Sequence, residues 1–149
     1  LERTAKNNMR VRVIGDKTGL SEDIQKSIAD VETASAGNTG LNFTIAINYG
    51  SRDEICRAVK KIVAEGIAPE DITEQVISDH LDTAGIPDPD LLLRTSGELR
   101  LSNYLMWQLA YTEFYFTDVP WPDFNKAELE KAIEKYNGRD RRYGGVKEE

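Results

Sequence analysis

Two kinds of hydrophobic pattern alternate along this chain. Short apolar runs, typical of strands, occupy residues 10–15, 43–49, 91–93 and 113–117. Between these runs the apolar residues recur at intervals of three and four, which predicts amphipathic helices. Because strand-like and helix-like segments take turns, we predict an α/β fold with a mainly parallel sheet flanked by helices.

Residues with capping chemistry mark the ends of the predicted helices. One helix begins at Ser21 and is stopped by Gly37, and another begins at Ser51, whose spacing from Glu54 is that of a capping box. Three further helices follow from the same periodicity: one over residues 73–82, one from about Ser102, and one from Asn125.

The second predicted helix carries the only cysteine of the chain. We expect its buried stripe to be formed by Ile55, Val59, Ile62 and Val63. Cys56 has apolar neighbours, so we interpret it as a packing residue rather than a reactive thiol. A single cysteine cannot form an internal disulfide, which favours an intracellular, reducing compartment.

Length and charge narrow the class of protein. The 149 residues predict a single α/β domain over 1–149. The formal net charge of -7 argues against a nucleic-acid surface, because such surfaces concentrate Lys and Arg. We find no unbroken apolar stretch near the roughly 20 residues that a membrane span requires.

The segment 91–103 carries the strongest chemical signal. Three leucines lead into a loop that holds Arg94, Arg100 and Ser102 around a turn at Gly97. A helix beginning at Ser102 would direct unpaired backbone N–H groups at the same loop, and arginines add forked donors. We therefore predict a site for phosphate or diphosphate; the alternative is that each arginine pairs with surface carboxylates.

A few other residues could carry chemistry. Glu113 precedes an aromatic strand, where a carboxylate could bind an Mg²⁺ ion that also bridges phosphate oxygens, or could serve as a salt-bridge partner. His80 has no second His or Cys for a transition-metal site, so we interpret it as structural or solvent-facing. The aromatic residues at helical spacing are interpreted as packing residues: Tyr104, Trp107 and Tyr111.

Several catalytic signatures are missing from the sequence. It contains neither the GxxxxGK[ST] phosphate loop nor the GxGxxG dinucleotide fingerprint. No second residue completes a Ser-His-Asp set around the single histidine. Kinase, dehydrogenase and serine-hydrolase functions therefore lose support.

Motifs along nearly the whole chain resemble the cis-prenyltransferases, in particular the undecaprenyl diphosphate synthase family. The matching segments are residues 10–16, 36–40, 48–52, 94–103, 107–108, 113–124 and 141–145. The resemblance implies a transferase that condenses isopentenyl diphosphate with an allylic, farnesyl-type diphosphate. The product would be a long Z-polyprenyl diphosphate, undecaprenyl diphosphate, for the lipid carrier of peptidoglycan precursors.

The resemblance also implies roles for individual residues. Arg94, Arg100 and Ser102 match the groups that hold the isopentenyl diphosphate head, and Glu113 matches a ligand of Mg²⁺, the expected cofactor. The family implies a cytoplasmic enzyme, associated peripherally with the membrane when product is released.

A C-terminal Arg-X-Gly motif crosses the dimer interface in this family. Arg142 and Gly144 match it, so the resemblance implies a homodimer in which they bind the diphosphate of the partner subunit.

One family element has no counterpart in the 149 residues: the Asp-Gly-Asn-Gly-Arg loop, whose aspartate is essential. We therefore expect the C-terminal part of a longer synthase, an incomplete cis-prenyltransferase fold with no catalytic residue of its own. Most of the allylic diphosphate site would be missing, and the chain would be inactive alone. The alternatives are a non-catalytic diphosphate-binding or dimerisation module, and an unrelated phosphate-binding α/β domain.

Overall fold

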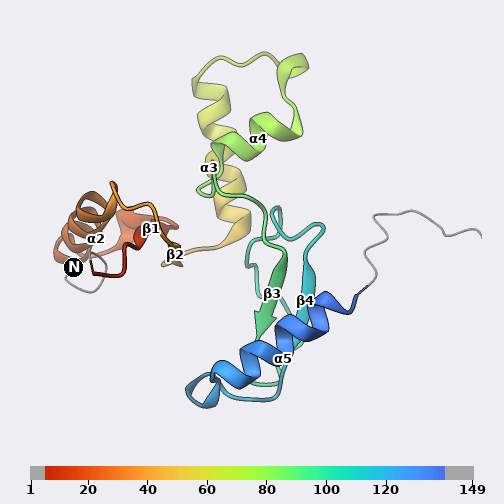
Figure 1. The fold of residues 1–149 in the computed structure, drawn as a ribbon. Coiled ribbons are helices and arrows are strands. Elements are labelled where there is room, and N and C mark those ends of the chain that lie inside the picture. Colours follow the sequence, from red (N-terminus) through yellow and green to blue (C-terminus); the bar gives the residue numbers. More distant parts are fainter. Residues whose placement is uncertain (1–5, 140–149) are drawn as a thin grey trace, which may run out of the picture. The chain divides into compact units, whose positions relative to one another are not determined.

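The computed structural model describes residues 6–139, which divide between Ile86 and Pro87 into two compact units, residues 6–86 and 87–139 (Figure 1). Each unit contains one pair of parallel strands with helices beside it. The predicted α/β class with parallel strands is therefore confirmed, whereas the single domain over 1–149 stays a prediction. No helix within residues 6–139 combines the length and the apolar character needed to cross a bilayer.

The first unit contains both strands and helices in the order that the pattern predicts. Its elements are β1 (Arg10–Ile14), a 3-10 turn (Lys17–Gly19), α2 (Glu22–Ser35), β2 (Asn42–Ala46), α3 (Ser51–Ala64), a 3-10 turn (Pro69–Asp71) and α4 (Glu74–His80). Ser21 and Thr73 are the N-cap residues of α2 and α4, as their positions before the helical patterns predict. The side chain of Thr73 accepts a hydrogen bond from the backbone N–H of Val76 at 3.2 Å.

Helix α2 protects the outer edge of β1. Val11 and Val13 are buried, and their backbone N–H groups point away from β2. These groups donate to side chains of α2 instead: Val11 to Oγ of Ser35 at 3.0 Å and Val13 to Oε1 of Glu32 at 2.7 Å. The helix thus satisfies an edge that would otherwise be open to pairing with another chain.

The buried face of α3 differs from the predicted one. Its buried residues are Ser51, Glu54, Ala58 and Ile62. Of the four residues of the predicted stripe only Ile62 is buried, while Val59 and Val63 are exposed. Cys56 is exposed as well, so its interpretation as a packing residue is wrong. The helix is oriented by polar contacts with the segment after α4, and hydrophobic periodicity does not report such contacts.

The predicted capping box of α3 does not form. The N-cap residue is Gly50, and Ser51 is the first residue of the helix. The Glu54 carboxylate accepts hydrogen bonds from the Tyr49 hydroxyl at 2.5 Å and the Asp82 backbone N–H at 2.9 Å. Glu54 is thereby used to join α3 to the segment after α4, rather than to cap its own helix.

Asp82 connects three parts of the first unit. Its carboxylate accepts two hydrogen bonds from the Arg57 guanidinium, both at 2.7 Å, and one from the Gly15 backbone N–H at 3.0 Å. Its backbone carbonyl accepts from Arg12 of β1 at 2.6 Å, and its N–H donates to Glu54. Asp82 therefore links the end of β1 to the first turns of α3.

The second unit has the shorter strands. Its elements are β3 (Leu91–Arg94), β4 (Glu113–Phe116), a 3-10 turn (Trp121–Asp123) and α5 (Lys126–Asn137). Leu91 lies opposite Glu113 and Arg94 opposite Phe116. The predicted start of the last helix is confirmed: Asn125 is its N-cap and accepts from the backbone N–H of Ala127 at 2.9 Å. Helix α5 packs against β4.

The helix predicted from Ser102 is wrong. Residues 102–111 form turns and bends, without a helix. Three residues have left-handed backbone conformations, with φ of 51° at Ser102, 62° at Asn103 and 44° at Leu105. A right-handed helix needs φ near −63°, so these residues interrupt it although the side chains have helical spacing. No helix N-terminus therefore contributes to the predicted anion site.

Candidate anion-binding site

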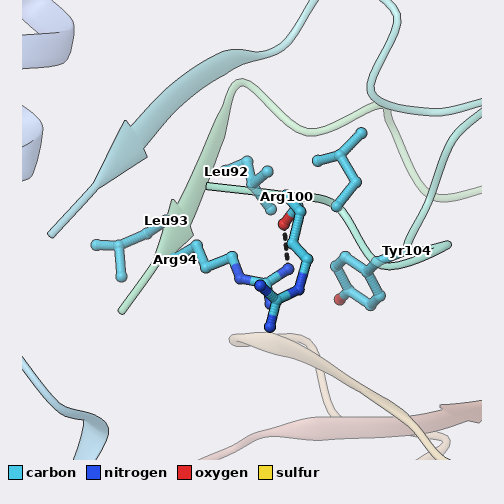
Figure 2. Close-up of a pocket in the computed structure, with 6 residues that line it drawn as sticks. Leu92, Leu93, Arg94, Arg100 and Tyr104 are labelled. Carbon is cyan, nitrogen blue, oxygen red and sulfur yellow. Dashed lines mark hydrogen bonds between the residues drawn. The ribbon is translucent and has the colours of Figure 1, made fainter. Parts of the chain in front are cut away.

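A pocket of about 250 Å³ lies at the carboxyl end of β3 (Figure 2). Two of its lining residues are the arginines that the sequence singled out, Arg94 and Arg100. The other lining residues are apolar or aromatic: Leu92, Leu93, Leu101 and Tyr104. The pocket thus offers positive charge beside an apolar wall, and its place agrees with the general position of ligands in α/β sheets.

Arg94 closes the loop that follows β3. It is the last residue of the strand, and its Nη1 donates to the backbone carbonyl of Arg100 (Figure 2). The same nitrogen lies 3.3 Å from Oγ of Ser102. The structure therefore brings together the three residues that were predicted to hold a diphosphate head.

The start of this loop is fixed against the segment after β4. Ser96 donates its backbone N–H to the carbonyl of Val119 at 3.0 Å, and Gly97 donates to the carbonyl of Thr117 at 2.9 Å. Gly97 has φ of +69°, which glycine adopts without steric cost, and an added Cβ would lie 3.0 Å from Oδ1 of Asp118. Backbone contacts, rather than a helix, thus determine where the loop lies.

Arg100 forms an ion pair with Glu98, two residues before it. The Arg100 side chain is 62% exposed and the Glu98 side chain 41%. The alternative considered for the sequence, an arginine paired with a surface carboxylate, therefore describes Arg100 in this structure. Arg94 differs, because its partners are a backbone carbonyl and a hydroxyl of the same loop.

Glu113 lies apart from these residues. It starts β4 opposite Leu91, three positions along the strand pair from Arg94, or about 10 Å at the usual rise per residue. Its carboxylate forms an ion pair with Arg139, which also donates to the carbonyl of Phe114 at 2.9 Å. The structure shows Glu113 as a salt-bridge partner and not as part of the pocket lining.

The described residues do not form a metal centre suited to Mg²⁺. Within residues 6–139 no three His, Cys, Asp or Glu side chains converge as possible ligands. Glu113 supplies a single carboxylate, and that carboxylate is bound to Arg139. A divalent cation there would need other oxygen donors, such as those of a diphosphate, and would have to replace the guanidinium.

Two of the predicted residues lie outside the described part of the chain, namely Arg142 and Gly144. One pocket residue was missed by the sequence interpretation. Tyr104 was assigned to helix packing, yet it lines the pocket, and burial raises the pKa of its phenol. Its closeness in sequence to Arg100 was the available signal, but the assumed helix obscured it.

Comparison with known proteins identifies the family. Residues 1–144 match the prenyltransferase family model, that of undecaprenyl diphosphate synthase. The isoprenyl transferase of Brucella suis biovar 1 (strain 1330) is 52% identical over 145 residues, which cover 95% of this chain and 57% of that protein. The isoprenyl transferase of Agrobacterium fabrum (strain C58) is 53% identical over 148 residues, covering 97% and 60%.

Solved structures agree with this assignment. Lavandulyl diphosphate synthase from Lavandula x intermedia, in complex with dimethylallyl diphosphate, superposes with a TM-score of 0.89 at 43% identity, covering 95% of this chain and 62% of that one. A Campylobacter jejuni structure described as a probable undecaprenyl diphosphate synthase gives 0.87 at 36% identity, covering 96% and 66%.

The matching relatives are longer than this chain. The chain spans between 57% and 60% of the two isoprenyl transferases. An unrelated phosphate-binding domain is nevertheless excluded, because the family match extends over nearly the whole chain. The chain belongs to the undecaprenyl diphosphate synthase family of cis-prenyltransferases.

Proposed function

We propose that this chain carries the isopentenyl diphosphate half-site of a synthase that makes a long Z-polyprenyl diphosphate, undecaprenyl diphosphate. The observation that carries the proposal is the pocket at the end of β3. It joins the guanidinium groups of Arg94 and Arg100 to a wall that includes Leu92 and Leu101. Isopentenyl diphosphate has the same two parts, a strongly anionic head and a short apolar tail.

In this proposal the chain binds and orients one of two reactants. Arg94 and Arg100 would donate to oxygens of the diphosphate head, and the Ser102 hydroxyl would add a neutral donor. The apolar wall would hold the alkene. During condensation the C–O bond of the allylic carbon breaks, diphosphate leaves with the electron pair, and the alkene of isopentenyl diphosphate forms a new C–C bond to that carbon. The isopentenyl unit then loses a proton to a diphosphate oxygen or to water. Fixing the alkene lowers the entropic part of this barrier.

Further parts of the proposal rest on the family resemblance. The allylic diphosphate would bind mainly to residues outside this chain, and Mg²⁺ would be the cofactor, with Glu113 as its carboxylate. Arg142 and Gly144 would reach the diphosphate of a partner subunit in a homodimer. The parent enzyme would be cytoplasmic, with peripheral membrane association during product release and a role in peptidoglycan precursor synthesis.

Calorimetric titration of the chain with isopentenyl diphosphate tests the half-site. Replacing both arginines, Arg94→Ala with Arg100→Ala, should weaken binding at least tenfold, because each charge-assisted contact contributes about 1.5–3 kcal/mol. Lys126→Ala is the matched control, since Lys126 is an exposed cation of the same unit, paired with Glu130 on α5. Equal affinity for the double variant and the control would contradict the proposal.

The proposed inactivity of the isolated chain needs a separate measurement. Incubation with isopentenyl and farnesyl diphosphates and Mg²⁺ should give no elongated product, and elongation by this chain would refute the expectation. The alternative function is a non-catalytic diphosphate-binding or dimerisation module. It is favoured by one observation, that both pocket arginines are engaged within their own loop. Elongation by the chain joined to the remaining length of a relative would exclude this alternative.

A further inference from the structure

The cations of the pocket are already engaged by acceptors of the same loop. Arg94 donates to the backbone carbonyl of Arg100 and lies within reach of Ser102. Arg100 is paired with the carboxylate of Glu98. An incoming anion therefore meets a pocket in which each guanidinium already has an internal partner, and it competes with these partners for the same positive charge.

The two internal partners differ in charge. The acceptor for Arg94 is a neutral carbonyl, which holds the loop closed but carries no net charge. The partner of Arg100 is an anion, and its two carboxylate oxygens resemble those of a phosphate group in charge and geometry. Glu98 occupies the same guanidinium that a diphosphate would use, and Arg100 reaches it without leaving the pocket lining.

The backbone of the loop is strained in this ligand-free arrangement. Four residues other than glycine have left-handed φ in or just after it: Ser96, Ser102, Asn103 and Leu105. Such conformations are costly for L-residues and persist only where other contacts hold them. The contacts of Arg94 reach from residue 94 to Arg100 and Ser102, so their exchange for an external anion would remove part of what holds Ser96 and Ser102 in these conformations.

We propose that Glu98 is a built-in competitor of the anion site, which holds Arg100 in the ligand-free chain and thereby sets the affinity of the pocket for diphosphates. The proposal rests on the proposed function, because it requires that Arg94 and Arg100 bind the diphosphate head. A bound diphosphate displaces the Glu98 carboxylate from Arg100. Removing the negative charge of Glu98 without changing its size therefore strengthens anion binding.

The test compares the affinities of the chain and its Glu98→Gln variant for inorganic pyrophosphate and for isopentenyl diphosphate, measured by calorimetry at fixed salt. The variant should bind both ligands about three- to tenfold more tightly, since it loses a competing carboxylate and its repulsion of the ligand. Glu130→Gln is the control: it makes the same change of charge in an exposed ion pair on α5, and should leave affinity unchanged.

A second background separates competition at Arg100 from a general change in charge. In the Arg100→Ala variant the gain from Glu98→Gln should fall to the part that comes from repulsion of the ligand, because the Arg100 guanidinium is no longer there for the carboxylate to occupy. A gain that keeps its full size without Arg100, or a Glu98→Gln variant that binds no more tightly than Glu130→Gln, would overturn the inference. Circular dichroism of each variant confirms that the fold is kept.

The variant that lacks both arginines distinguishes failure of the proposed function from failure of the competitor proposal. If Arg94→Ala with Arg100→Ala leaves pyrophosphate affinity unchanged, the pocket is not the anion site, whatever Glu98→Gln does. If binding depends on both arginines but is unaffected by Glu98→Gln, the half-site stands and only the competitor is rejected.

Discussion

Replacing Asp82 by asparagine changes the side chain very little in size but should strongly destabilise the first unit. The Asp82 side chain is only 12% exposed and accepts three hydrogen bonds, two of them from the Arg57 guanidinium. Asn keeps the shape but turns an N–H₂ group toward these donors. Arg57 then loses its less exposed anionic partner and keeps only Asp53, whose side chain is 60% exposed.

The expected magnitude follows from these contacts. Hydrogen bonds to charged groups contribute about 1.5–3 kcal/mol, and removing one partner of a buried ion pair costs about 3–5 kcal/mol. Because the Arg57 side chain is 25% exposed, solvent offsets part of the loss. We therefore expect Asp82→Asn to lower the free energy of opening of the first unit by about 3 kcal/mol, or roughly 100-fold in the opening equilibrium.

Hydrogen exchange measures this effect within the first unit. The Ile47 amide donates to the carbonyl of Ile14 at 3.0 Å rather than to Asp82, so its exchange reports opening of the strand pair. Asp53→Asn is the matched control, because it removes the exposed partner of the same guanidinium and should cost at most about 1 kcal/mol. Equal effects of the two variants would refute the assignment of Asp82 as the connecting residue.

The same contacts predict a dependence on pH. Burial alone would raise the pKa of Asp82, but the hydrogen bonds from Arg57 and Gly15 outweigh it, so the net pKa is below the ordinary 3.8. A carboxyl with a lowered folded-state pKa stabilises the protein fully above its unfolded value and loses this contribution as the pH falls through the folded value. Asp82→Asn should therefore flatten the loss of stability below about pH 4.

Three further predictions concern other parts of the chain. The hydrogen bond to Glu65 raises the pKa of His80 above 6.5. The charged ring therefore stabilises the folded chain fully below pH 6.5, and this contribution is lost as the pH rises through the pKa of the folded state. A ring pKa at or below 6.5, measured by NMR, would contradict this. Gly15→Ala should lower the free energy of unfolding, measured in urea, by more than about 2 kcal/mol, because the added Cβ would clash with a backbone carbonyl at a residue with φ of +111°. Gly66→Ala, where the Cβ would enter open space, should cost about 1 kcal/mol. Similar losses for the two variants would count against the clash. The exposed apolar face around Phe43 should make the chain associate, and a monodisperse monomer in light scattering would refute this.

Periodicity located the strands and most helices well. All four predicted strands form, and β1 extends from Arg10 to Ile14 within its predicted range. These segments succeed because alternation of side chains and capping residues are local properties of the chain. The same local signals failed for the helix from Ser102, where left-handed residues imposed by loop contacts override helical spacing.

In the candidate site, too, the sequence indicated which residues lie close together along the chain but not which ones the fold brings in or keeps apart. Arg94, Arg100 and Ser102 were placed together correctly, because they lie within nine residues of one another at the end of a single strand. Glu113 is separated from Arg94 by the parallel register of β3 and β4, which puts the start of one strand beside the start of the other. Tyr104 entered the pocket through turns that the periodicity did not predict.

The sequence by itself determined the α/β class, the order of the strands and of the helices other than the one expected from Ser102, and the family, since these depend on local periodicity and on motifs that can be read residue by residue. Only the tertiary structure decided which partners the charged residues take. Asp82 binds Arg57, and Arg139 binds Glu113. The physical reason is that an ion pair forms between whichever opposite charges the fold brings within a few ångströms, and sequence spacing does not encode that distance for residues on different elements.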